Sequence, residues 1–110
     1  MKIATFNCNS VRSRLDAVLG WLAEQSPDYL CLQETKTQDA EFPAEAFTSA
    51  GWSVVFKGEK SYNGVAIVSK KPADEVSFGL DTAPADEPRL VHARYGPVHV
   101  INTYVPQGRD

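Results

Sequence analysis

The stretch YLCLQETK, residues 29–36, decides the fold of this chain. Its first half is a short apolar run typical of a buried strand, and the run stops abruptly at QETK, residues 33–36. A carboxylate at the end of a buried strand is held rigidly, as a metal ion or a reacting phosphate requires. The start of the chain has the same form, because the mainly apolar residues 1–6 are followed by NCNSVR at 7–12. Two such strand ends indicate a site for a polyanion.

The residues between these two strands predict a helix. Apolar side chains recur at three- and four-residue spacing from about Val11 to Gln25, and Ser10 precedes them as a plausible N-cap. The sequence Ser-Pro-Asp at 26–28 ends the pattern. Strand, helix and strand in this order form a parallel crossover unit, so we expect strands 2–6 and 29–32 to lie parallel in one sheet.

The rest of the chain predicts a second helix and further strands. We expect a helix at 44–49 closed by Gly51, strands at 52–56, 65–69 and 75–78, polar turns at 58–63 and 81–88, and a hairpin of 89–95 with 98–105. This order is typical of an α/β fold with a mixed sheet and helices on one face.

Apolar residues in the last predicted strand occupy both parities, at Val98, Val100, Ile101 and Val105. That pattern indicates burial on both sides, yet no residues remain after the strand to cover a second face. We therefore expect an exposed sheet face, to be covered by a missing C-terminal half or by a second copy of the chain.

Composition limits the class of protein. The 110 residues suffice for one small domain, and a net charge of −3 argues against a protein that coats nucleic acid by bulk charge. No apolar run approaches the length of a membrane span, so we expect a cytoplasmic protein without a membrane partner. Cys8 and Cys31 lie in apolar segments without metal-type spacing and are predicted to be buried free thiols.

Glu34 is the first candidate for chemistry. Mg²⁺ prefers oxygen ligands and is typically bound by one or two carboxylates together with waters and phosphate oxygens, so one glutamate can anchor such an ion. The alternative is a surface carboxylate paired with Lys36. Asn7 and Asn9 can orient a ligand or a phosphate through their amides, or they are ordinary turn residues.

Other polar residues are weaker candidates. Arg12, in the first turn of the predicted helix, and Lys36 can bind phosphate, or they are solvated charges. Tyr62, Asn63 and Gly64 form a predicted loop tip, which is usually only a turn. The hydroxyl of Tyr104 can reach a substrate oxygen, although a buried tyrosine is commoner. His92 and His99 lie within strands and are interpreted as structural.

Four segments together resemble the exonuclease III family of DNA repair nucleases, within the endonuclease/exonuclease/phosphatase superfamily. They are MKIATFNCNSVRSRL at 1–15, PDYLCLQETK at 27–36, GEKSYNGVAI at 58–67 and VINTYVPQG at 100–108, in the family's order. The resemblance implies the N-terminal half of a four-layered α/β sandwich, so that residues 1–110 are an incomplete domain. It also implies metal-dependent hydrolysis of DNA phosphodiesters at abasic sites and from 3′ ends, in base-excision repair, with Mg²⁺ or Mn²⁺.

The resemblance also implies roles for individual residues. Glu34 is the metal ligand, Asn7 lies beside the metal and Tyr104 contacts the reacting phosphate. Positions that line the DNA groove are Asn9, Arg12, Lys36, Asn63 and Arg89, the last after Pro88 where the family usually has glycine.

The family's acid or base aspartate, and its aspartate–histidine pair, lie beyond the position of Tyr104 and have no counterpart here. We therefore expect the parent protein to be the enzyme and this chain alone to be inactive. The alternatives are a related phosphodiesterase acting on RNA, lipid or inositol phosphates, and a noncatalytic half-sandwich module.

Overall fold

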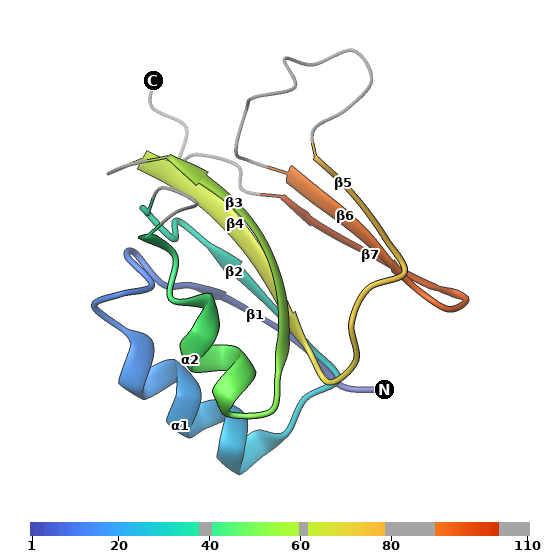
Figure 1. Cartoon of the computed structure of the whole chain (residues 1–110), viewed down its shortest axis with the longest axis horizontal. Helices are drawn as coiled ribbons and strands as arrows, with labels where there is room; N and C mark the ends of the chain where they lie inside the picture. The colour runs from blue at the N-terminus through green and yellow to red at the C-terminus, as the bar shows by residue number, and fades with distance from the viewer. Residues whose placement is uncertain (38–40, 60–61, 79–89, 104–110) are drawn as a thin grey trace.

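The strands form two sheets that face each other, and helices cover the outer side of the first sheet (Figure 1). The computed structural model describes residues 1–37, 41–59, 62–78 and 90–103. The first sheet has the order β1-β2-β4-β3, with β1 (Ile3–Asn7), β2 (Tyr29–Gln33), β3 (Ser53–Glu59) and β4 (Tyr62–Ser69). The second has the order β5-β6-β7, with β5 (Glu75–Phe78), β6 (Leu90–Tyr95) and β7 (Val98–Thr103). The helices are α1 (Leu15–Gln25) and α2 (Ala44–Ser49).

The predicted crossover is present. β1 and β2 pair in parallel, with Ile3 opposite Tyr29 and Asn7 opposite Gln33, and α1 connects them. At the starts of the two strands, the backbone N–H of Lys2 donates to Asp28 Oδ2 at 2.7 Å. This hydrogen bond holds the pKa of the Asp28 carboxyl below its usual range. The two strands are therefore fixed in register from their first residues.

The inner strands β2 and β4 of the first sheet are buried on both faces, and this explains the unbroken apolar character of β2. Leu30 and Leu32 pack toward the helices, in a core that also contains Leu22 and Phe47. Cys31 points the other way, into a second core formed with residues of the second sheet. The predicted α/β fold, with a mixed sheet and helices on one face, is confirmed.

The expectation that the other face of this sheet lies open is wrong. The hairpin of β6 and β7 does not extend the first sheet but joins β5 in a second one, which covers that face. Consequently β7 is buried on one side only: Val100 is 6% exposed, whereas Ile101 is 61% exposed. The exposed face is the outer side of the second sheet, where the imidazoles of His92 and His99 lie 2.9 Å apart, Nε2 to Nδ1.

The start of α1 differs from the sequence prediction. The helix begins at Leu15, not Val11, and its N-cap residue Arg14 makes no side-chain cap. Ser10 Oγ accepts the N–H of Ser13 at 3.4 Å, as an N-cap does. Residues 11–14 nevertheless form a turn, which is bonded to the segment after β2 by the N–H of Val11 and Thr35 O at 2.9 Å, and the α-helix begins only after it. In the described part of the chain, neither helix is long and apolar enough to cross a membrane.

The predicted turn at 58–63 is also shorter than expected. β3 continues to Glu59 and β4 begins at Tyr62, so Tyr62 and Asn63 belong to a strand and not to a loop tip. The pairing shifts register between Lys57 and Glu59, which lets the two strands run on past the predicted turn. Asn63 therefore lies within β4.

Both cysteines are buried free thiols, as predicted. Cys8 belongs to the core beneath the helices and Cys31 to the core between the sheets. Burial raises the pKa of each thiol to about 11, and the carboxylate of Glu34 adds a smaller increase at Cys8. A raised pKa favours the protonated thiol, which is not the reactive form.

We expect neither thiol to react with Ellman's reagent in the folded protein at pH 8, because only about one thiol in a thousand is ionised three units below its pKa. Both should react promptly in denaturant. Cys8→Ala and Cys31→Ala identify which thiol a given signal belongs to. Rapid modification of the folded protein, at a rate independent of denaturant, would contradict the burial described here.

Candidate functional site

The candidate site is built where β1 and β2 end side by side. Hydrogen bonds continue past the last residues of the strands: the N–H of Cys8 donates to Gln33 O at 3.0 Å, and that of Ser10 to Glu34 O at 2.8 Å. The N–H of Val11 donates to Thr35 O at 2.9 Å. The two polar segments that follow the strands are thus held together and cannot separate into independent loops.

The backbone at this edge is left-handed at several residues other than glycine. φ is 47° at Asn9 and 95° at Ser10 on one segment, and 55° at Glu34 and 56° at Lys36 on the other. Such conformations cost about 1–3 kcal/mol each and persist only where the surroundings impose them. Their concentration at this one edge is typical of a functional site.

The side chains of three predicted site residues meet here. Lys36 Nζ donates to Asn9 Oδ1 at 2.6 Å and lies 3.8 Å from Glu34 Oε1. Asn7 joins them through its amide oxygen, which accepts the N–H of Asn9 at 3.2 Å. The ion pair of Glu34 with Lys36, expected for a surface carboxylate, is therefore present within the cluster. The roles of these residues remain predictions.

Arg12 is not in the first turn of a helix, so no helix terminus adds to the affinity of its side chain for phosphate. It lies in the turn before α1, since Val11 bonds to the end of β2 and the helix begins only at Leu15. Its Nη1 is 4.0 Å from Glu41 Oε1, and its side chain is 64% exposed. Arg12 is thus an exposed cation near the site, without help from a helix terminus.

Three other predicted residues lie at the margin of what the structure describes. Asn63 is in β4, one residue before Gly64, and only its backbone is described. Arg89 and Tyr104 lie outside the described residues, although each is adjacent to a described strand, β6 and β7 respectively. Their roles rest on the sequence alone.

Gln33 and Asn102 were not predicted as site residues. Gln33 Nε2 donates to Thr5 Oγ1 on β1 and to Asn102 Oδ1 on β7, each at 2.8 Å. Asn102 is 2% exposed, and its Nδ2 donates to Leu32 O at 2.9 Å and to Ala66 O at 2.8 Å. The alternation of side chains along β2 could have indicated the direction of Gln33. Gln33 lies on the same face of the strand as Cys31, which packs against the second sheet.

The residues at this edge fit a divalent metal held by few protein ligands. Glu34 offers a carboxylate whose side chain is 20% exposed, and the exposed Asn7 offers an amide oxygen on the neighbouring strand end. Waters and phosphate oxygens normally complete such a site for Mg²⁺. In the part of the chain that the structure describes, no three His, Cys, Asp or Glu side chains gather to hold a metal. These residues form a platform and not a closed cage.

An α/β sandwich with a polar, strained cluster at the carboxyl ends of two parallel strands is the class of protein defined by this geometry. Residues 4–107 match the sequence profile of the Endonuclease/Exonuclease/phosphatase family. The chain belongs to this family.

Named relatives show which members of the family this chain is similar to. Exodeoxyribonuclease III of Haemophilus influenzae is 34% identical over all of this chain, which covers 43% of that protein. An AP endonuclease from Archaeoglobus fulgidus is 56% identical with a TM-score of 0.93, over 98% of this chain and 42% of that one. The 3′-5′ exonuclease NExo from Neisseria meningitidis is 46% identical with a TM-score of 0.90, over 94% and 41%.

These similarities confirm the resemblance to exonuclease III that the four motifs indicated. The chain spans less than half the length of each of these relatives.

Gly64 gives a test of the strained edge. Its φ is 99°, and a Cβ at this position would meet Thr35 Oγ1 and approach Lys36 N at 3.3 Å. We expect Gly64→Ala to lower the free energy of unfolding by at least about 1–3 kcal/mol, because the backbone strain adds to the clash with the segment that carries Glu34. Urea denaturation measures this change.

Gly20 is the matched control, since it lies in α1 with nothing within 4 Å of a Cβ built there. Gly20→Ala should raise the free energy of unfolding by about 0.5–1 kcal/mol. Equal effects of the two substitutions would show that Gly64 is not confined as described.

Proposed function

We propose that the protein carrying this chain hydrolyses DNA phosphodiesters with a divalent metal, at abasic sites and from 3′ ends, in base-excision repair in the cytoplasm. The observation that carries this proposal is the position of Glu34. Its carboxylate is held on a left-handed backbone at the end of a buried strand, next to the amide of Asn7 on the adjoining strand end and near the cation of Lys36. The names of the relatives support DNA as the substrate, and one solved structure, of the 3′ phosphatase NExo from Neisseria, is bound to a product DNA hairpin.

In this proposal Glu34 and Asn7 hold Mg²⁺, with Mn²⁺ as a substitute. A bound divalent ion would neutralise charge on the reacting phosphate and orient it. The chain's own residues then bind and position the DNA. Lys36 and Asn9, already hydrogen-bonded to each other, present a cation and an amide beside the metal position, and Arg12 adds an exposed cation near the same edge.

The remaining roles come from the family resemblance. Tyr104, which follows β7 by one residue, is proposed to contact the reacting phosphate, and Asn63 and Arg89 to contact DNA. Phosphodiester hydrolysis also needs a general base and a stabilised leaving group. We propose that these groups come from outside residues 1–110, so that the chain by itself binds without turnover.

Glu34→Gln in the complete protein tests the metal role. The change removes the charge and keeps the shape, so we expect cleavage of abasic-site DNA to fall about 100-fold or more and the Mg²⁺ concentration for half-maximal activity to rise. Initial rates across a Mg²⁺ series, and calorimetric titration of Mg²⁺, measure the two effects. RNA, phospholipid and inositol phosphate substrates assayed in parallel separate the DNA reaction from related phosphodiesterase activities.

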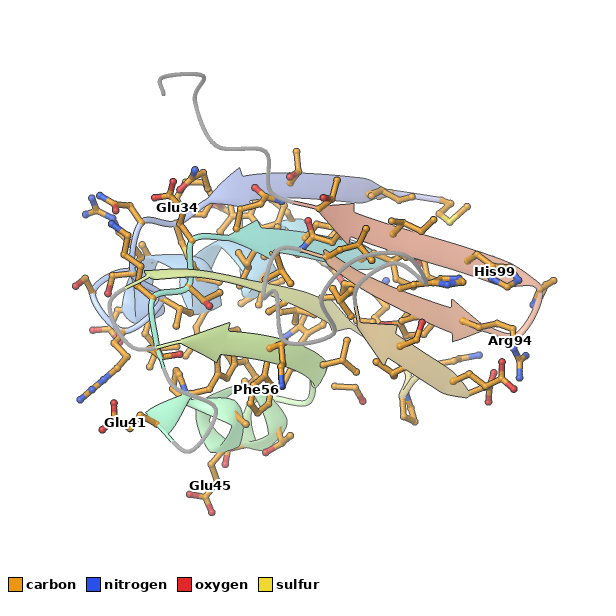
Figure 2. All side chains as sticks on the ribbon, turned by 90° about the horizontal axis from the view of Figure 1, so that it is seen from above. Glu34, Glu41, Glu45, Phe56, Arg94 and His99 are labelled. Carbon is orange, nitrogen blue, oxygen red and sulfur yellow. The ribbon has the colours of Figure 1, made fainter. Side chains whose placement is uncertain are left out.

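Glu45→Gln is the matched control because it removes the same charge from α2, where Figure 2 shows Glu45 pointing away from the strand ends. Its activity and Mg²⁺ dependence should equal those of the unaltered protein. If both variants behave alike, Glu34 does not hold the metal.

A noncatalytic module that pairs with a second copy of the chain is the alternative, and exposed apolar side chains favour it. Ile3 is 54%, Phe6 44% and Trp21 37% exposed, on β1 at the edge of the first sheet and on α1 beside it. This alternative predicts that the 110-residue chain forms dimers whose stability falls in Phe6→Ser and not in Ser77→Ala on the second sheet. If sedimentation equilibrium shows only monomers of the chain at high concentration, this alternative is wrong.

A further inference from the structure

Asn102 is a buried polar residue whose side chain joins the two sheets. It comes from β7 in the second sheet, and both of its Nδ2 donations go to carbonyls of the first sheet, Leu32 O on β2 and Ala66 O on β4. Leu32 and Ala66 are paired neighbours in the antiparallel ladder of β2 with β4. One amide therefore ties β7 to two adjacent strands at the same level of the first sheet.

The third hydrogen bond of Asn102 leads toward the candidate site. Its Oδ1 accepts Gln33 Nε2 at 2.8 Å, and Gln33 also donates to Thr5 Oγ1 at 2.8 Å. Gln33 is the last residue of β2 and the one before Glu34. The side chain preceding the proposed metal ligand is thus clamped from both sides, by β1 and by β7.

Packing alone does not require an amide at this position. Val100 faces the first sheet from the same side of β7, two residues earlier, and fills its place with a purely apolar side chain at 6% exposure. A buried amide is costly unless all its polar groups are satisfied, and a fully satisfied one fixes a single arrangement of its partners. The amide at 102 meets that condition, because each of its polar atoms is hydrogen-bonded.

The positions of Gln33 and Asn102 in the sequence relate this hydrogen-bond network to the candidate site. The two segments that carry the proposed reaction residues leave the two sheets within two residues of the network: Glu34 follows Gln33, and Tyr104 comes two residues after Asn102. Figure 2 shows Glu34 at one end of the strands, with His99 and Arg94 of the second sheet at the opposite end. The network lies at the end where the site is, and not at the turn of the hairpin.

We propose that Asn102 is a positioning residue for the active site, acting through Gln33 to set the segment that carries Glu34 relative to β7. This inference rests on the proposed function for its effect on activity. Its structural part, that Asn102 orders residues 33–37 through Gln33, does not depend on which substrate the protein cleaves.

The test compares three variants of the complete protein. Asn102→Leu keeps the number and branching of the side-chain heavy atoms and removes the hydrogen bonds. Gln33→Leu breaks the link from the other side. Val100→Ala removes apolar packing from the same face of β7 and leaves the hydrogen bonds in place. Thermal unfolding of each variant measures how much stability it loses, so that activity can be compared at temperatures where all are folded.

We expect Asn102→Leu and Gln33→Leu to lower kcat on abasic-site DNA about 10- to 100-fold, as for residues that orient a metal ligand, with little change in KM for DNA. The Mg²⁺ concentration for half-maximal activity should rise in both. The double variant should be no worse than the poorer single variant, because both substitutions break the same link. Val100→Ala, at equal or greater loss of stability, should retain kcat.

Hydrogen exchange provides a readout independent of activity. Peptides covering residues 33–37 should exchange faster in Asn102→Leu and Gln33→Leu than in Val100→Ala. If the unaltered protein does not cleave abasic-site DNA, the proposed function fails, while faster exchange still supports the ordering role. The inference is wrong if hydrogen exchange and kcat across the three variants follow only their loss of stability. If Asn102→Leu does not fold, the comparison of Gln33→Leu with Val100→Ala tests the inference, because Gln33 is partly exposed.

Discussion

The hydrogen bonds that continue from the ladder of β1 and β2 beyond the strand ends are the interaction on which the site depends. Here Cys8, Ser10 and Val11 still donate to the carbonyls of residues 33–35. Three consequences follow together: the left-handed backbone on both segments, the late start of α1, and the meeting of Lys36 with Asn9. The strain is local, and this continued pairing sustains it.

Burial on both faces of β2 and β4 is the second constraint, and it directs polar side chains by parity. Along β2, Leu30 and Leu32 face the helices, whereas Cys31 and Gln33 face the second sheet. The same alternation sends Val100 and Asn102 inward from β7 and leaves Ile101 exposed. Gln33 therefore reaches Asn102 because the apolar residues beside it have already decided which way the strand faces.

Local patterns predicted most of the secondary structure, and long-range contacts account for the errors. The hairpin around Gly96 and Pro97, the strand at 75–78 and the helix at 44–49 were predicted from short local patterns and were confirmed. Ser10 Oγ accepts the N–H of Ser13 as an N-cap does, but the N–H groups of Ser10 and Val11 are bonded to Glu34 O and Thr35 O, partners that no local window contains, and the α-helix begins only at Leu15. The division into two sheets was missed for a similar reason, because periodicity says that a strand is buried and does not say against which sheet.

The residues at the candidate site also include some that the sequence predicts and one that it does not. Asn7, Asn9, Glu34 and Lys36 could be placed together because parallel strands bring their carboxyl ends to one edge, which topology alone ensures. Asn102 could not, because an asparagine inside a strand has no distinguishing pattern and its partners are 36 to 70 positions away in the sequence.

The nature of the contact between the two sheets explains why a polar link lies at the end of the strands that carries the candidate site. Apolar contacts between stacked sheets are non-directional and tolerate small shifts along the strands, so they bury surface without fixing a register. Hydrogen bonds from one buried amide to β2 and β4 have direction, and leaving a buried donor unsatisfied costs about 1–3 kcal/mol. A shift of one sheet along the other would break them while most of the apolar contact survived. The apolar core thus holds the two sheets together, and the amide of Asn102 fixes their relative position along the strands.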